Sequence, residues 1–216
     1  MNGIYEKNSQ QREFWAGKFG DEYVDRSNEF DKVNRLYKEN TGISLEQIYQ
    51  KFFEKIDRDA AILELGCNVG LNLNLLQRSG FQDLTGVELN KKAYETAKRN
   101  NSKIKFINSS IEDFESNDLY DVVFTAGVLI HINPVILSEV VKKMISLTRK
   151  YIFGFEYFSE DPIEVGYRGN PKTLWKQDFA KLFLQSYPGL EIVMEEKFHY
   201  KKENLIDVAY LLRKLS

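Results

Sequence analysis

The stretch AAILELGCNVGLNLNLL, residues 60–76, decides how the chain folds, because it joins a buried strand to a helix through a loop of unusual composition. Residues 60–65 form an apolar run of strand length that carries one carboxylate, Glu64. Gly66 and Gly70 follow, and glycine permits the sharp turns and close backbone approach that a binding loop requires. The helix after Gly70 begins with N–H groups that have no partner within the helix. The pattern therefore predicts a ligand site where the first strand ends.

Short apolar runs and amphipathic helices alternate after residue 58, which is typical of parallel βαβ units. Predicted strands cover 60–66, 83–89, 103–109, 120–127 and 150–158, and predicted helices cover 70–80, 90–100, 134–147 and 174–185. Asn90 is placed to cap the second of these helices. Two further strands, 190–200 and 205–214, are long enough to pair as a hairpin. The prediction is an α/β fold: a Rossmann-like seven-stranded, mostly parallel sheet with helices on both faces, one antiparallel edge strand and an N-terminal helical segment.

The first 58 residues have the pattern of helices rather than strands. Apolar residues of the stretch 44–56 recur at steps of three and four, and Ser44 and Gln47 have the spacing of a capping box. Upstream, 11–31 is expected to form a short helix, a turn near Gly20 and a loop. We expect residues 1–58 to form a helical cap packed on a single globular unit, 59–216.

Composition limits the classes of partner. The net charge of −2 argues against a general affinity for nucleic acid or for an anionic membrane. Cys67 is the only cysteine in the sequence, so an internal disulfide is impossible, as suits a reducing compartment. The first residues lack the pattern of a signal peptide, and no apolar stretch is long enough for a transmembrane helix. The expectation is a cytoplasmic protein without a metal site, whose oligomeric state the sequence leaves open.

The spacing of the loop residues separates the ligand classes. A dinucleotide-binding loop reads G-x-G-x-x-G, but the second and third positions here are Asn68 and Leu71. The phosphate-binding pattern that ends in G-K-[ST] is also absent. What remains is acid-x-Gly-x-small-x-Gly over residues 64–70, which resembles motif I of the class I S-adenosylmethionine-dependent methyltransferases. Asn68 stands where that motif usually has glycine, and asparagine tolerates a positive φ better than most residues.

The resemblance implies S-adenosyl-L-methionine as cofactor and S-adenosyl-L-homocysteine as product. It implies that Glu64 attracts the amino group of the cofactor, and that Glu88, 22 residues after Gly66, accepts hydrogen bonds from both ribose hydroxyls. A solvated glutamate at a strand end is the other interpretation of Glu88. The expected cofactor-binding residues are Glu64, Gly66, Cys67, Asn68, Gly70, Glu88, Leu89, Ser110, Ile111, Thr125, Ala126 and Val128.

Three residues are candidates for removing a proton from the methyl acceptor: Glu156, His131 and Tyr157. Glu156 and Tyr157 lie at the end of the fifth predicted strand, and His131 lies just past the fourth. The other interpretation of His131 is a histidine at a helix start that is bonded to the backbone. His199, in a terminal strand, is expected to be structural.

The stretch 155–179 is expected to be a long loop without regular structure, and such loops are frequently functional. Its GYRGNP sequence, 166–171, places a lone Arg168 where it can hold an anionic group, or where it is simply solvated in a surface turn. This loop and the N-terminal segment together resemble a narrower family, the pseudaminic acid biosynthesis-associated methylases. The shared positions are Trp15, Phe19, Gly20, Tyr23 and Arg26, and then Glu156, Tyr157, Phe158, Pro162, Tyr167, Arg168, Gly169, Asp178 and Phe179.

This resemblance implies a small acidic acceptor, a sugar or nucleotide sugar of bacterial nonulosonic acid biosynthesis. The expected substrate-binding residues are Tyr23, Arg26, Tyr157, Tyr167 and Arg168. Two alternatives remain open: a nucleic-acid or protein methyltransferase, and a protein that binds the cofactor without catalysis. The absence of a basic stripe in the sequence disfavours nucleic acid as the substrate.

Overall fold

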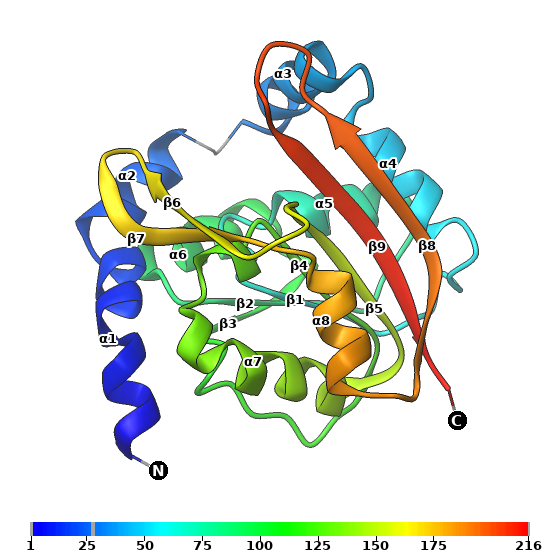
Figure 1. Cartoon of the computed structure of the whole chain (residues 1–216). Helices are drawn as coiled ribbons and strands as arrows, with labels where there is room; N and C mark the ends of the chain where they lie inside the picture. Colours follow the sequence, from blue (N-terminus) through cyan, green and yellow to red (C-terminus); the bar gives the residue numbers. More distant parts are fainter. Residues whose placement is uncertain (1, 27–28, 216) are drawn as a thin grey trace.

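A seven-stranded sheet forms the centre of the computed structural model, which describes residues 2–26 and 29–215 (Figure 1). Its strand order is β3-β2-β1-β4-β5-β9-β8. The first five strands of the chain pair in parallel, and β9 runs antiparallel to both of its neighbours. The strands are β1 (Ile62–Leu65), β2 (Leu84–Glu88), β3 (Lys105–Asn108), β4 (Tyr120–Ala126), β5 (Thr148–Tyr157), β8 (Leu190–His199) and β9 (Ile206–Lys214).

The mostly parallel sheet and the terminal hairpin are thus confirmed. The register adds that β9 lies between β5 and β8, so the reversed strand is next to last and β8 closes that edge.

Helices cover both faces of the sheet because the strands alternate between two apolar cores. Leu63 and Val123 join the core beneath α7 (Pro134–Leu147) and α8 (Phe179–Ser186). Ile62 and Val122 join the opposite core, which contains α4 (Leu45–Phe53), α5 (Leu71–Arg78) and Ala97 of α6 (Lys91–Asn100). Asn90 caps α6 as predicted, its side chain accepting from the N–H of Ala93. No helix within 2–26 or 29–215 is both long and apolar enough to cross a bilayer.

The N-terminal segment is helical, as predicted: α1 (Asn2–Ala16), α2 (Lys18–Arg26) and α3 (Phe30–Thr41) precede α4. The Ser44–Gln47 capping box forms at the start of α4. The predicted turn near Gly20 is wrong. The helix breaks at Gly17 instead, and Gly20 lies buried inside α2, where an added Cβ would come 1.9 Å from the carbonyl oxygen of Trp15. Gly20 therefore permits a close helix approach rather than a reversal of the chain.

The stretch 155–179 is not an irregular loop. After β5 it forms a two-stranded hairpin, β6 (Ile163–Tyr167) and β7 (Asn170–Lys176), separate from the main sheet. Arg168 and Gly169, at the turn, have φ of 48° and 81°, the left-handed values that a two-residue hairpin turn demands. The helix expected over 174–185 accordingly begins later, at Phe179, after the Asp178 cap, and Leu174 belongs to β7.

A substitution at Gly154 of β5 would test how tightly strand β9 packs against β5. An added Cβ there would lie 2.0 Å from Cζ of Tyr210, its buried cross-strand partner. Because overpacking forces neighbours to shift, Gly154→Ala should lower the free energy of unfolding by about 1–3 kcal/mol in urea titrations. Gly166→Ala is the control, since its Cβ would meet nothing closer than 3.7 Å. Equal stability of the two variants would contradict the packing described.

Candidate functional site

A cavity of about 410 Å³ opens at the carboxyl ends of the parallel strands. Its walls come from the loops after β1, β2, β3 and β4, from the end of β5 and the start of β9, and from α1, α2 and α3. One end is formed by Ser110 and Glu112 after β3, and the other by Tyr200 and Asp207 at the β8–β9 turn. The cavity therefore runs across five adjacent strands and the reversed strand.

The loop after β1 adopts left-handed backbone conformations at three positions. Gly66, Asn68 and Gly70 have φ of 76°, 48° and 78°. An added Cβ at Gly66 would lie 2.7 Å from Cγ2 of Val128, so the backbone itself forms the wall there. The tolerance of asparagine for positive φ explains how Asn68 replaces the usual glycine. This loop offers backbone groups, rather than side chains, to a ligand.

Glu88 ends β2 and ties two loops together. Its carboxylate accepts hydrogen bonds from the backbone N–H of Asn68 at 2.8 Å and from that of Asn90 at 2.6 Å. Burial raises its carboxyl pKa, and these backbone hydrogen bonds act in the opposite direction. A carboxylate has about four acceptor positions, so capacity remains for hydroxyl donors in the cavity that Glu88 lines.

Glu64 lies behind the cavity wall rather than on it. Its side chain is fully buried, and Oε1 accepts a hydrogen bond of 2.7 Å from the side-chain amide of Asn72, which does line the cavity. Oε2 has no partner among the described residues. Burial raises the carboxyl pKa to about 8. Glu64 thus acts on the cavity through Asn72.

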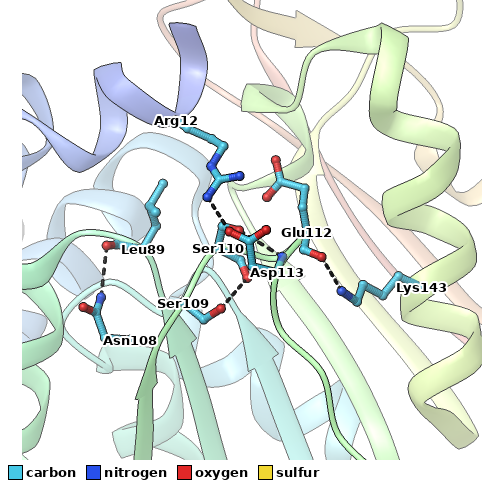
Figure 2. Close-up of polar contacts among 8 residues, drawn as sticks. All are labelled: Arg12, Leu89, Asn108, Ser109, Ser110, Glu112, Asp113 and Lys143. Carbon is cyan, nitrogen blue, oxygen red and sulfur yellow. Dashed lines mark hydrogen bonds and ion pairs between the residues drawn. The ribbon is translucent and has the colours of Figure 1, made fainter. Parts of the chain in front are cut away.

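The loop after β3 is fastened from two sides (Figure 2). Arg12, which reaches over from α1, forms an ion pair with Asp113. The Ser110 hydroxyl accepts from the backbone N–H of Asp113 at 3.0 Å. The side-chain amide of Asn108 donates to the carbonyl oxygen of Leu89 at 3.0 Å, which joins this loop to the end of β2. Leu89, Ser110 and Ile111, three of the expected cofactor-binding residues, all line this end of the cavity.

Glu156 holds the loop after β4 in place. Its carboxylate accepts from the backbone N–H groups of Val128 and Leu129, both at 3.2 Å. Burial raises the carboxyl pKa to about 7. The side chain is 2% exposed and borders the cavity. Its first role is therefore to orient the peptide groups beside Val128.

His131 ends a short 3-10 helix, η1 (Leu129–His131), and faces the cavity. Its Nδ1 lies 2.7 Å from the carbonyl oxygen of Thr173 in β7, so Nδ1 carries the hydrogen and Nε2 keeps its lone pair. The ring packs against Trp15 and Tyr167, at centroid distances of 4.5 and 5.1 Å. Burial lowers the pKa of the imidazole to about 4. The histidine is thus bonded to backbone and also offers an unprotonated nitrogen at neutral pH.

The two predicted arginines lie outside the cavity lining. Arg26 stacks over Phe19, 5.7 Å from the ring centroid, and Arg168 lies 5.6 Å from that of Tyr167. Most of the predicted residues do meet around the cavity: Gly66, Cys67, Asn68, Glu88, Leu89, Ser110, Ile111, Ala126, Val128, His131, Glu156, Tyr157, Tyr23 and Tyr167. Those that do not line it are Glu64, Gly70, Thr125, Arg26 and Arg168.

Sequence reasoning missed part of the wall: Arg12, Tyr37, Tyr200 and Asp207. No motif surrounds them. Tyr37 belongs to a polar helix, Tyr200 to a hairpin turn and Asp207 to the first residues of an otherwise apolar strand. The weak signal for Asp207 was a lone carboxylate inside a buried run, the same kind of signal that singled out Glu64.

Residues 62–151 match the family model described as methyltransferase domain. Among curated relatives, the ubiquinone biosynthesis O-methyltransferase of Rickettsia akari (strain Hartford) is 33% identical over 125 residues, which are 55% of this chain and 48% of that protein. The chain therefore spans about half the length of this relative.

Two solved structures share the fold over nearly the whole chain. The Burkholderia thailandensis 1,6-didemethyltoxoflavin-N1-methyltransferase has a TM-score of 0.72 at 13% identity, covering 100% of this chain and 92% of that one. The magnesium protoporphyrin IX methyltransferase of Synechocystis PCC 6803 has a TM-score of 0.69 at 15% identity, covering 99% and 100%. The fold is therefore the Rossmann-like fold found in methyltransferases, with a methyltransferase-domain sequence at its centre.

The raised pKa of Glu64 predicts a pH dependence of stability. The buried carboxyl keeps its proton up to about pH 8, whereas in the unfolded chain it ionises near pH 4.5, so its contribution to stability is lost as pH rises through that window. Glu64→Gln imitates the neutral acid. The unfolding free energy of the variant, relative to the parent, should therefore increase between pH 5 and 8.5 in denaturant titrations.

Glu54→Gln, at the exposed end of α4, controls for the loss of a negative charge. If the two variants followed the same pH dependence, the neutral buried state of Glu64 would be ruled out.

Proposed function

We propose that this protein is an S-adenosylmethionine-dependent methyltransferase that acts on a small-molecule acceptor. One observation carries the proposal: the half-buried Glu88 carboxylate is joined to the left-handed loop of residues 66–70 on one cavity wall. That pairing suits a nucleoside with a free ribose diol and no phosphate, because the carboxylate accepts hydroxyl donors and the backbone can be approached closely. The methyltransferase-domain match over 62–151 supports it.

The residues that line the cavity suit S-adenosylmethionine in their chemistry and arrangement. Glu88 would take the ribose hydroxyls, and Leu89, Ser110 and Ile111 would enclose the adenine. Gly66, Cys67 and Asn68, with Ala126 and Val128 across the cavity, would border the amino acid portion. Gly66 cannot carry a side chain without meeting Val128, which explains why the loop needs glycine. When bound, the cofactor supplies a methyl group already activated on a sulfonium.

Catalysis by the chain then consists of alignment and proton removal. His131 is the favoured base, because the bond from Nδ1 to Thr173 fixes the ring and leaves Nε2 able to accept a proton. Glu156 orients the peptide groups after β4, and both of its oxygens are engaged with backbone N–H groups. Tyr157 borders the same region and is the remaining candidate.

The finer proposal for the acceptor is a small acidic metabolite, a sugar or nucleotide sugar of nonulosonic acid biosynthesis. It is supported by residues at positions shared with the pseudaminic acid biosynthesis-associated methylases. Four of them, Trp15, Phe19, Tyr23 and Tyr167, form one aromatic cluster over the cavity. Arg26 and Arg168 stand on the rings of this cluster, where the acidic group would enter. Residues 1–58 would then act as a cap on the unit 59–216. A hydroxyl acceptor is the second candidate, favoured by the name of the Rickettsia akari relative, an O-methyltransferase of ubiquinone biosynthesis, and phenols serve as its test compounds.

Calorimetry and product analysis test these proposals together. The protein should bind S-adenosylhomocysteine, and incubation with labelled S-adenosylmethionine should label one component of a bacterial nucleotide-sugar extract, identified by mass spectrometry. A label on a phenol panel instead would replace the sugar assignment. Tight binding without transfer to any pool, including nucleic acid and protein, would identify a non-catalytic binding protein.

Removing the Glu88 carboxylate should weaken cofactor binding. Hydrogen bonds to a charged group contribute about 1.5–3 kcal/mol, so Glu88→Ala should lower the affinity for S-adenosylhomocysteine at least about tenfold in calorimetry. Glu95→Gln, on the exposed side of α6, is the matched control and should bind like the parent. Unchanged affinity of the Glu88 variant would remove the ribose from this position.

His131→Ala should lower kcat about 100-fold or more while leaving S-adenosylhomocysteine affinity within about twofold, because the imidazole acts on the acceptor. Since its pKa is about 4, the parent should keep its full rate down to about pH 5. His199→Ala, which changes the chain's other histidine, is the control. Full activity of the His131 variant would exclude the proton-accepting role.

A further inference from the structure

The end of the cavity farthest from Ser110 holds a buried carboxylate that the mechanism does not use. Asp207, at the start of β9, is 3% exposed and lines the cavity. Its Oδ2 accepts a hydrogen bond from the Tyr200 hydroxyl at 3.2 Å. Its Oδ1 is buried and has no hydrogen-bond partner among the described residues. A buried carboxylate oxygen without a partner is costly, so a donor from outside the chain is the expected complement.

Tyr37 of α3 adds a second incomplete group at the same place. Burial raises the pKa of the Asp207 carboxyl to about 6, and the nearby Tyr37 hydroxyl opposes that rise, but no hydrogen bond of normal geometry joins the two groups within the part of the chain that the structure describes. Burial raises the pKa of the Tyr37 hydroxyl, and the nearby Asp207 carboxylate raises it further. The phenol therefore stays protonated. Both groups border the cavity.

The walls around Asp207 are aromatic. The Tyr37 ring meets Phe155 at a centroid distance of 5.7 Å and Tyr200 at 6.0 Å. Tyr157 is the cross-strand partner of Asp207 in β5 and also lines the cavity. Aromatic faces carry negative charge density, so rings and carboxylate together favour a cation over an anion.

Among the described residues, no arginine or lysine lines this end of the cavity. Within the described ranges, the lining contains one arginine or lysine, Arg12, and that residue is paired with Asp113 at the opposite end. Lys176 of β7 acts on Asp207 electrostatically, but its ammonium lies 5.3 Å from the centroid of Tyr157 and the residue is not part of the lining. His131 is held by Thr173, and its low pKa keeps it neutral.

We propose that Asp207, Tyr37 and Tyr200 form a subsite that binds a cationic nitrogen of the methyl acceptor, an amine or amidine. The proposal rests on the proposed function and deepens it by naming a charge at one end of the substrate. Asp207 Oδ1 receives an N–H donor from that group, and the neighbouring rings surround the cation. A neutral hydroxyl would leave the charge of the carboxylate uncompensated, and a carboxylate of the acceptor would be repelled.

The position of the subsite also orients the acceptor. Asp207 lies on β9 beside the end of β5, so in strand order β4 and the loop after it lie between Asp207 and the proposed nucleoside pocket. The acceptor atom that receives the methyl group would then lie between Asp207 and the proposed nucleoside pocket. The acidic group of the proposed acceptor would point the other way, toward Arg26 and Arg168 outside the cavity.

Three fragments of one shape test the charge preference: benzylamine, benzyl alcohol and benzoate. Each is titrated into the full-length protein at pH 7.5 and followed by ligand-observed NMR, with S-adenosylhomocysteine present at saturation. The parent should bind benzylamine about tenfold or more tighter than either other fragment. Asp207→Asn should reduce that preference to about twofold, whereas Asp161→Asn, an exposed carboxylate in the connection before β6, should keep it.

A second variant separates loss of the subsite from misfolding of the protein. Tyr200→Phe removes only the hydroxyl that bonds Asp207 and should weaken benzylamine binding less than Asp207→Asn does. Calorimetry with S-adenosylhomocysteine on each variant shows that its nucleoside pocket is intact. Equal binding of the three fragments by the parent, or an undiminished preference in a folded Asp207→Asn protein, would overturn the subsite. If S-adenosylhomocysteine does not bind at all, the methyltransferase proposal fails, and the same titration of the free protein still decides the subsite.

Discussion

The site depends on two carboxylates at strand ends, the half-buried Glu88 and the buried Glu156, that accept hydrogen bonds from the backbone of neighbouring loops. Glu88 takes N–H groups from the loop after β1 and from the start of α6, and Glu156 takes them from the loop after β4. These loops leave different strands, so each carboxylate fixes the position of one wall relative to another. The cost of burying the two charges is offset by these backbone donors. Glu88 thus fixes the left-handed loop at Asn68 relative to the start of α6, and Glu156 fixes the turn at Val128 relative to the end of β5.

Segments outside the main sheet also enclose the cavity. Arg12 binds Asp113, and the Gln11 side-chain amide donates to the carbonyl oxygen of Lys172 at 3.1 Å, so α1 joins the loop after β3 to the β6–β7 hairpin. The same hairpin holds His131 through Thr173. The proposed cofactor side is thus built mainly by the sheet, whereas the proposed acceptor side is built mainly by segments outside the methyltransferase-domain match. This division explains why the fold is shared widely while the acceptor must be argued from this chain alone.

The main sheet was predictable because most of its strands are apolar runs bounded by clear signals, although β3 and β8 mix polar and apolar residues. Ser44 and Gln47 marked the start of α4, and Asn90 marked that of α6. Glu88 was predictable from its spacing to the glycine loop. The β6–β7 hairpin was not, since β6 is short and largely exposed and β7 begins with the residues Asn170–Lys172, whose sequence resembles a loop. Arg12 and Asp207 could not be placed either, because tertiary structure alone brings them to the cavity: Arg12 meets a partner 101 positions away in the sequence.

The distribution of the wall along the chain has a consequence for biosynthesis. One cavity draws on Arg12 near the beginning of the chain and on Asp207 near its end. A nascent polypeptide can form the parallel strands in order as they emerge, but β9 must insert beside β5 after β8 has already been made. The pocket therefore becomes complete only after residue 207 has been made, and a chain cut short before that residue would carry the loop of residues 66–70 without the opposite wall.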